Sequence, residues 1–206
     1  MRFIAIILLI SNTCFAQLKV AVIDSGTDMK LVDAPFCEIP LPDASDIKHG
    51  TSTVDLIAKN AGDANYCIYS FRIAEPRFNL KKYLNTLRYL TKIHIDVLNL
   101  SIEGTVYSKT EASLIKQLLN QGVTIIAAAG NDGINLTKHN CKIYPACIDP
   151  RIVVVGSYNK FSNTGDRINI KTNRDHGCVG GICLTGTSQA TAVETGRFIQ
   201  FLDKHE

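Results

Sequence analysis

The sequence predicts an α/β fold, a three-layer, doubly wound, mostly parallel sheet in one domain. Short apolar runs rich in β-branched residues alternate with segments whose apolar residues recur at helical spacing, and this alternation is typical of βαβ units. The apolar runs are nearly continuous, as in parallel strands that helices cover on both faces. With 206 residues, of which 46% are hydrophobic, the chain can build a single core.

Each expected element follows from a local pattern. Residues 18–23 are apolar and β-branched and run into the turn-forming Asp24-Ser25-Gly26, so we expect a buried strand that ends there. In chain order, the same reasoning predicts strands at 18–23, 66–73, 96–101, 123–129 and 151–156, and helices at 51–59, 79–92, 110–120 and 189–201. Functional groups in such sheets gather beyond the carboxyl ends of the strands, and Asp24 and Asn131 both fall there.

The first residues have the layout of a secretory signal peptide. Arg2 precedes the short apolar run 3–10, and Ala16 is a suitable last residue before cleavage. We therefore expect 1–16 to be the signal peptide, 17–206 to be a single domain, and the mature protein to be secreted or periplasmic.

Two other interpretations of this segment are weaker. A membrane anchor would need a longer apolar run to cross a bilayer. Lipid attachment at Cys14 is disfavoured because the polar Asn12 and Thr13 before it fit a bacterial lipoprotein signal poorly.

The remaining cysteines are even in number, which in an exported chain predicts up to three disulfides. One pair has a geometric argument, because Gly180-Gly181 suits the type I′ turn of a hairpin that brings Cys178 opposite Cys183. A second pair is close in sequence, and the third follows by elimination. The expected pairs are Cys178 with Cys183, Cys141 with Cys147, and Cys37 with Cys67. A zinc site is disfavoured because no Cys-x-x-Cys spacing occurs.

The charge pattern carries little information on partners. Charged residues make up 20% of the chain, its formal net charge is +3, and no long run of like charge occurs. This is not the footprint of a nucleic-acid-binding protein. A glycine-rich phosphate loop of the dinucleotide or Walker type is absent after the first strand, so we expect no nucleotide cofactor. We also predict no metal site.

Three short segments carry the groups that activate a serine nucleophile. Asp24 lies in Val-Ile-Asp-Ser-Gly, His49 in His-Gly-Thr, and Ser188 in Gly-Thr-Ser. The imidazole would take the proton of the hydroxyl, and the carboxylate would orient the imidazole. His49 and Ser188 precede or begin helical segments, whose amino ends favour negative charge. Asn131, after an apolar strand, offers a side-chain amide that could hold an oxyanion together with the backbone N–H of Ser188.

These segments resemble those of subtilisin-like serine proteases, the subtilases, in residue type and in the chain order Asp, His, Ser. The similarity runs from Val20 to Ala190. It implies a serine endopeptidase, with Asn131 as the oxyanion asparagine. It also implies that an extended substrate adds a strand along residues 101–104 and 128–130. The substrate-binding residues expected from this resemblance are Ser101, Ile102, Glu103, Gly104, Ala128, Ala129 and Gly130.

The chain also departs from the subtilase pattern. Asp55 and Glu103 occupy positions where glycine is common, and Ala192 stands where a proline is usual. The acidic Glu103, near the expected cleft, could favour a basic or polar substrate residue. Only 17–23 separate the expected cleavage point from Asp24, so we expect a compact form without a propeptide, in which disulfides and short loops assist folding.

Two functions remain open at this point. The first is a monomeric, exported endopeptidase that acts on proteins or peptides. The alternative is a binding protein that keeps the fold and the cleft but has weak or no activity. The remaining histidines have no matching partner segment and are expected at the surface or in satisfied positions; they are His94, His139, His176 and His205.

Overall fold

The computed structural model of the protein describes residues 16–38, 48–74, 77–137 and 140–205. The expected signal peptide therefore lies almost entirely outside the described residues, as does His139. None of the helices in the described part of the chain combines the length and apolar character needed to cross a membrane.

A parallel sheet forms the middle of the molecule, as predicted. Within the described residues it has six strands in the order β2-β1-β3-β4-β5-β6, and every neighbouring pair is parallel. The strands are β1 Leu18–Asp24, β2 Tyr66–Arg72, β3 Val97–Leu100, β4 Thr124–Ala128, β5 Val153–Ser157 and β6 Ile170–Thr172. Strand β1 pairs with β2 on one side and with β3 on the other, so the strand order reverses at β1. Asp24, the last residue of β1, lies at this point.

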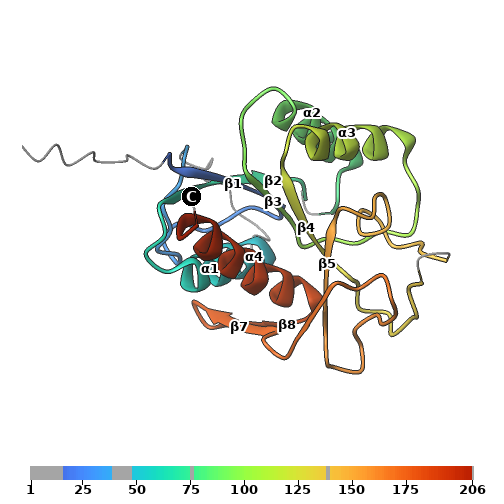
Figure 1. The fold of residues 1–206 in the computed structure, drawn as a ribbon. Helices are drawn as coiled ribbons and strands as arrows, with labels where there is room; N and C mark the ends of the chain where they lie inside the picture. Colours follow the sequence, from blue (N-terminus) through green and yellow to red (C-terminus); the bar gives the residue numbers. More distant parts are fainter. Residues whose placement is uncertain (1–15, 39–47, 75–76, 138–139, 206) are drawn as a thin grey trace, which may run out of the picture.

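Helices cover both faces of this sheet (Figure 1). The pair α2 Leu80–Leu90 and α3 Lys109–Asn120 lies on one face, and α1 Lys48–Ala61 with α4 Thr187–Asp203 lies on the other. Strand β1 shows why two cores form: Ala21 and Ile23 belong to the core under α2 and α3, while Val20 and Val22 belong to the core under α1 and α4.

The ends of the elements differ from the sequence-based expectation by up to three residues; helix α1, for example, begins at Lys48 and so includes His49. Two differences have a local cause. Strand β5 begins at Val153 and not at Arg151, because the Asp149 carboxylate accepts the backbone N–H of Arg151 at 3.0 Å and holds a turn there. Strand β6 is not predicted, since its three residues are too few to show a pattern.

Helices α1 and α4 approach each other closely at Gly196. A Cβ atom on this residue would lie 2.4 Å from the carbonyl oxygen of Ile57 in α1, so only glycine allows this contact. The contact between α1 and α4 at Gly196 matters for function because α1 carries His49 and α4 carries Ser188.

The sequence departs from the subtilase pattern at Asp55, and α1 accommodates this residue. Its buried carboxylate pairs with Lys59 at 2.7 Å.

The structure contains the three disulfides that the sequence predicts: Cys37–Cys67, Cys141–Cys147 and Cys178–Cys183. The last joins β7 His176–Val179 to β8 Ile182–Thr185, which form the predicted hairpin, with Cys178 directly opposite Cys183. Gly180 and Gly181 have φ angles of 55° and 78°, as a type I′ turn requires. Figure 1 places this hairpin beside α1 and α4.

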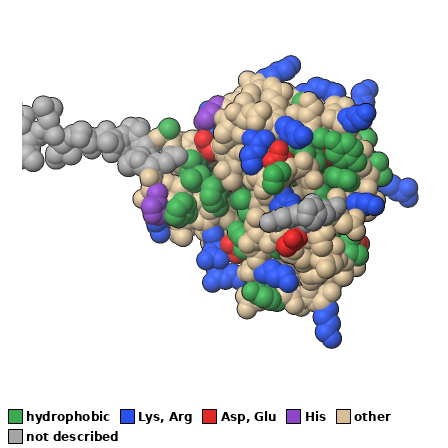
Figure 2. Space-filling view, turned by 45° about the vertical axis from the view of Figure 1, so that its right-hand side comes forward, with side chains coloured by type: hydrophobic (Ala, Val, Ile, Leu, Met, Phe, Trp, Pro, Cys, Tyr) green, Lys and Arg blue, Asp and Glu red, His purple; other side chains and the backbone are tan. Residues whose placement is uncertain are grey.

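The charged side chains are dispersed at the surface. On the face shown in Figure 2, lysine and arginine side chains are spread over the molecule and do not gather into one patch. A few acidic side chains lie among them.

Candidate active site

The candidate catalytic residues meet at one edge of the sheet. Asp24 is the last residue of β1, and Asn131 follows β4 by three residues. His49 and Ser188 are each the second residue of a helix, in α1 and α4. Since α1 and α4 pack side by side, the fold brings these distant segments to a common edge.

A hydrogen bond joins the side chains of Asp24 and His49 at the centre of the site. Nδ1 of His49 lies 2.8 Å from Oδ1 of Asp24, whose side chain is only 3% exposed. The carboxylate also accepts the backbone N–H of Ser25 at 2.6 Å and the hydroxyl of Thr53 at 3.2 Å. Because the carboxylate can only accept, Nδ1 carries the proton and Nε2 keeps the lone pair of a base.

Local packing holds this pair in place. The backbone N–H of Gly50 donates to the Ser25 hydroxyl at 3.0 Å. A Cβ atom on Gly50 would lie 2.2 Å from the carbonyl oxygen of Gly26, so the start of α1 rests directly on the turn after β1. The glycine after His49 is therefore required for the close approach that brings the imidazole to Asp24.

Ser188 is joined to the segment after β3. Its hydroxyl donates to the carbonyl of Ser101 at 3.0 Å, and the Ser101 hydroxyl donates to the carbonyl of Ser188 at 2.9 Å. Asn99 extends this network, since its side-chain amide donates to the Ser101 hydroxyl at 3.1 Å and its Oδ1 accepts the hydroxyl of Thr195 at 2.9 Å. These buried bonds fix α4 against β3 and so position Ser188.

The side chain of Asn131 contacts Thr187, the first residue of α4, which precedes Ser188. Its Oδ1 accepts the backbone N–H of Thr187 at 2.9 Å. An N–H must face an oxygen, so this bond fixes the orientation of the amide and leaves Nδ2 as a donor. Because Ser188 is the second residue of α4, the positive end of this helix also lies at the site.

Comparison with known proteins agrees with this geometry. A model described as "Subtilase family" matches residues 16–204. The chain belongs to the subtilase family. Its similarity to individual subtilases is distant: it is 25% identical to Subtilisin of Bacillus pumilus over 92% of this chain and 78% of that protein. It is also 25% identical to Subtilisin E of Bacillus subtilis (strain 168), over 92% of this chain and 56% of the relative. The chain thus spans little more than half the length of Subtilisin E.

Solved structures confirm the fold. The chain superposes on a cold adapted subtilisin-like serine proteinase with a TM-score of 0.73 and 22% identity, covering 91% of this chain and 76% of that one. A lanthipeptide protease gives a TM-score of 0.72 and 19% identity, with 91% and 73% covered. The predicted subtilisin-like α/β fold is therefore correct, and family membership supports a serine-type peptidase.

In one of the two segments expected to bind substrate, the backbone groups of Ala129 and Gly130 have partners within the protein. The carbonyl of Ala129 accepts from the Asn163 side chain at 2.8 Å, and the carbonyl of Gly130 accepts from the Asn163 backbone N–H at 2.9 Å. The N–H of Ala129 donates to the carbonyl of Val155, and the N–H of Gly130 donates to the Thr187 hydroxyl. Gly104 exchanges both backbone bonds with Tyr144, at 2.9 and 2.8 Å. The backbone groups of Ala129 and Gly130 are therefore already bonded within the protein, and these two residues form a wall that Asn163 holds.

Sequence reasoning missed three supporting residues of the site. Thr53 bonds Asp24, Thr187 orients Asn131, and Asn163 holds the wall at Ala129. Thr53 could have been found, because a residue four positions after His49 shares its face of the helix. Nothing in the local sequence around Asn163 indicates its role, since it is more than thirty residues from its partner.

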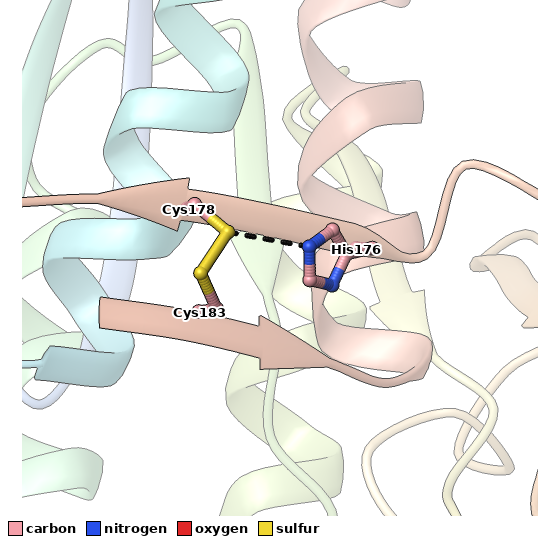
Figure 3. A group of neighbouring side chains, drawn as sticks. All are labelled: His176, Cys178 and Cys183. Atoms are coloured by element: carbon pink, nitrogen blue, oxygen red, sulfur yellow. Dashed lines mark hydrogen bonds between the residues drawn. A yellow bond between two sulfur atoms is a disulfide. The ribbon is translucent and has the colours of Figure 1, made fainter. Parts of the chain in front are cut away.

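A second cluster lies on the β7–β8 hairpin (Figure 3). His176 points along the strand toward the disulfide, with Nε2 at 3.2 Å from the sulfur of Cys178, and its Nδ1 lies 2.8 Å from the Thr185 hydroxyl. Within the described residues, this is the one trio of His, Cys, Asp or Glu whose ligand atoms are close enough to hold a metal ion. Its two sulfurs are bonded to each other, so neither is a free thiolate ligand.

Proposed function

We propose that this subtilase is an exported serine endopeptidase, secreted or periplasmic, that hydrolyses peptide bonds through an acyl-enzyme. The observation that carries the proposal is the 2.8 Å contact between the buried Asp24 carboxylate and Nδ1 of His49. It leaves Nε2 of His49 to act as a base, and α1, which carries His49, packs against α4, which carries Ser188. The expected signal peptide at 1–16 supports export. A relative named "Minor extracellular protease Epr" from Bacillus subtilis (strain 168), 27% identical over 85% of this chain and 30% of the relative, points the same way.

Substrate binding would prepare the nucleophile. In the resting state the Ser188 hydroxyl donates to the carbonyl of Ser101 at 3.0 Å. A substrate strand that pairs with 101–103 donates its own N–H to this carbonyl and displaces the hydroxyl. The released hydroxyl then turns about χ1 of Ser188 and donates to Nε2 of His49.

The reaction then follows from the roles of these groups. Oγ of Ser188 bonds to the carbonyl carbon of the scissile peptide while its proton passes to Nε2 of His49, and Asp24 stabilises the imidazolium. The oxyanion accepts from Nδ2 of Asn131 and from the backbone N–H of Ser188. His49 next gives its proton to the leaving amine, which departs and leaves an ester on Ser188. Water, deprotonated by His49, hydrolyses the ester and restores the serine.

A fluorophosphonate probe tests the proposal, because it reacts with an activated serine and not with an ordinary hydroxyl. We expect the purified protein to gain one label, mapped by mass spectrometry to Ser188, and the matched Ser188→Ala variant to gain none. Circular dichroism and thermal unfolding establish that both proteins are folded. Folded protein without Ser188-dependent labelling would contradict the endopeptidase and favour the binding-protein alternative.

A further inference from the structure

The side chain of Glu103 reaches from the segment after β3 to the segment after β4. Its Oε2 accepts the backbone N–H of Asn131 at 3.1 Å. A Cβ atom on Gly130 would lie 2.1 Å from this oxygen, and Gly130 has φ of +98°. The carboxylate thus lies directly against the backbone of Gly130, where any other residue would place a Cβ atom in its way.

In the part of the chain that the structure describes, this carboxylate has no cationic partner. Among the described residues, no lysine, arginine or histidine forms an ion pair with Glu103, and the charge that acts on it is the like charge of Asp132. Partial burial and repulsion from Asp132 raise the pKa of Glu103, although interactions with the backbone and side-chain amides of Asn131 lower it. A partly desolvated carboxylate in this state is stabilised by any cation that reaches it.

The position of the carboxylate connects it to catalysis. Asn131, which Glu103 contacts directly, is the proposed donor to the oxyanion. A negative charge beside this donor opposes the negative charge that develops on the attacked carbonyl. A cation seated on Glu103 neutralises the carboxylate and removes the opposition, so its effect extends to the transition state.

We propose that Glu103 selects a lysine or arginine at the substrate residue whose carbonyl Ser188 attacks. This residue is the last one paired with 101–103, and its side chain projects between that segment and the wall at Gly130, where the carboxylate lies. The inference rests on the proposed endopeptidase activity and names its substrate class: peptides cleaved after a basic residue.

The test uses quenched fluorescent peptides that are identical except for lysine, glutamine or norleucine at this position. For the unmodified protein, kcat/KM for the lysine peptide should exceed that for the glutamine peptide by about ten- to a hundred-fold, the range of a charge-assisted hydrogen bond. Glu103→Gln keeps the shape of the side chain and should reduce this ratio to within about threefold of unity. Glu103→Lys should favour a glutamate peptide instead.

Asp132→Asn is the matched control, because it removes one negative charge from the adjacent loop and should keep the lysine preference. The pH dependence gives a second readout. The lysine-to-glutamine ratio of kcat/KM should fall as pH decreases and Glu103 becomes protonated, whereas protonation of His49 affects both peptides alike and cancels in the ratio.

Failure of this inference is distinguishable from failure of the proposed function. A protein that labels at Ser188 and cleaves peptides without a lysine preference, or keeps the preference in Glu103→Gln, overturns the role of Glu103 alone. A preference for small neutral residues would show that the side chain only fills space. Calorimetry with Ser188→Ala adds a readout without hydrolysis: the lysine peptide should bind more tightly than the glutamine peptide, and Glu103→Gln in this background should abolish the difference.

Discussion

At the scale of single residues, each proposed catalytic group is held by at least one bond to its surroundings. The carboxylate of Asp24 accepts from Thr53 and Ser25 as well as pairing with His49. Asn131 is oriented by the backbone of Thr187. Such supporting bonds reduce the reorganisation that the site needs during a reaction, because the groups already occupy the geometry in which they act.

Asn131 allows its two roles to be separated by substitution. Asn131→Ala removes both the acceptor for Thr187 and the donor to the oxyanion, and kcat should fall about 10²- to 10³-fold, the range that removal of one such donor has in subtilisins. Asn131→Asp keeps an oxygen that can accept from Thr187 but has no donor and adds a charge that repels the oxyanion.

Kinetics of peptide hydrolysis by the two variants provide the measurement. We expect Asn131→Asp to be at least as impaired in kcat as Asn131→Ala, with the fold retained. If Asn131→Asp were as active as the unmodified protein, Asn131 would serve only to position Thr187.

The sequence predicted these residues to different degrees. The proposed catalytic residues could be predicted from the sequence because each lies in a short contiguous segment whose residue types indicate its chemical role. They are Asp24, His49, Asn131 and Ser188. The contact of Glu103 with Asn131 could not, because it joins two loops whose separation depends on how β3 and β4 pack.

At the scale of elements, one buried polar contact joins the helices on the face opposite the site. The hydroxyl of Tyr83 in α2 donates to Oε1 of Glu111 in α3 at 2.8 Å, and both residues are buried. Burial raises the pKa of Glu111 above its ordinary value of 4.5, against the lowering effect of the bond from Tyr83. The folded protein therefore prefers this carboxyl in its neutral form.

This preference predicts how stability depends on pH. Below the unfolded-state pKa of 4.5 the carboxyl is neutral in both states. The favourable contribution of the neutral, buried carboxyl to the free energy of unfolding is therefore complete at low pH. It is lost as pH rises through the higher folded-state pKa, where the folded protein must ionise a buried group. Each unit of elevation costs about 1.4 kcal/mol.

Glu111→Gln keeps an acceptor for Tyr83 and removes the ionisation. Urea unfolding at about pH 4 and about pH 8 should show a smaller loss of stability on raising the pH in this variant than in the unmodified protein. Asp63→Asn, at an exposed position, is the control and should not change the pH dependence. An identical pH dependence in Glu111→Gln would contradict the assignment.

The elements themselves were largely readable from sequence. Long apolar runs and helical spacing predicted five strands and four helices near their observed positions, because the two-core arrangement imposes those patterns. Strand β6 was not predicted because Ile170–Thr172 is short and lies at the sheet edge, where pairing with β5 determines its conformation.

At the scale of the whole molecule, the site exists only because the doubly wound sheet gathers distant segments. Asp24 and Ser188 are separated by most of the chain, yet β1, β3 and α4 place them at one edge. The close contact of α4 with α1 at Gly196 links the helix that carries Ser188 to the helix that carries His49. The proposed activity is therefore a property of the assembled fold.

The central claim is that His49 and Ser188 act as one unit, and a double-mutant comparison of peptide hydrolysis tests it most directly. kcat/KM would be measured for His49→Ala, for Ser188→Ala and for the double variant, each purified separately. The account predicts that each single change lowers kcat/KM by at least about 10⁴-fold and that the double change lowers it no further, because each group works only through the other. Losses that multiply in the double variant, or single variants that remain active, would contradict it.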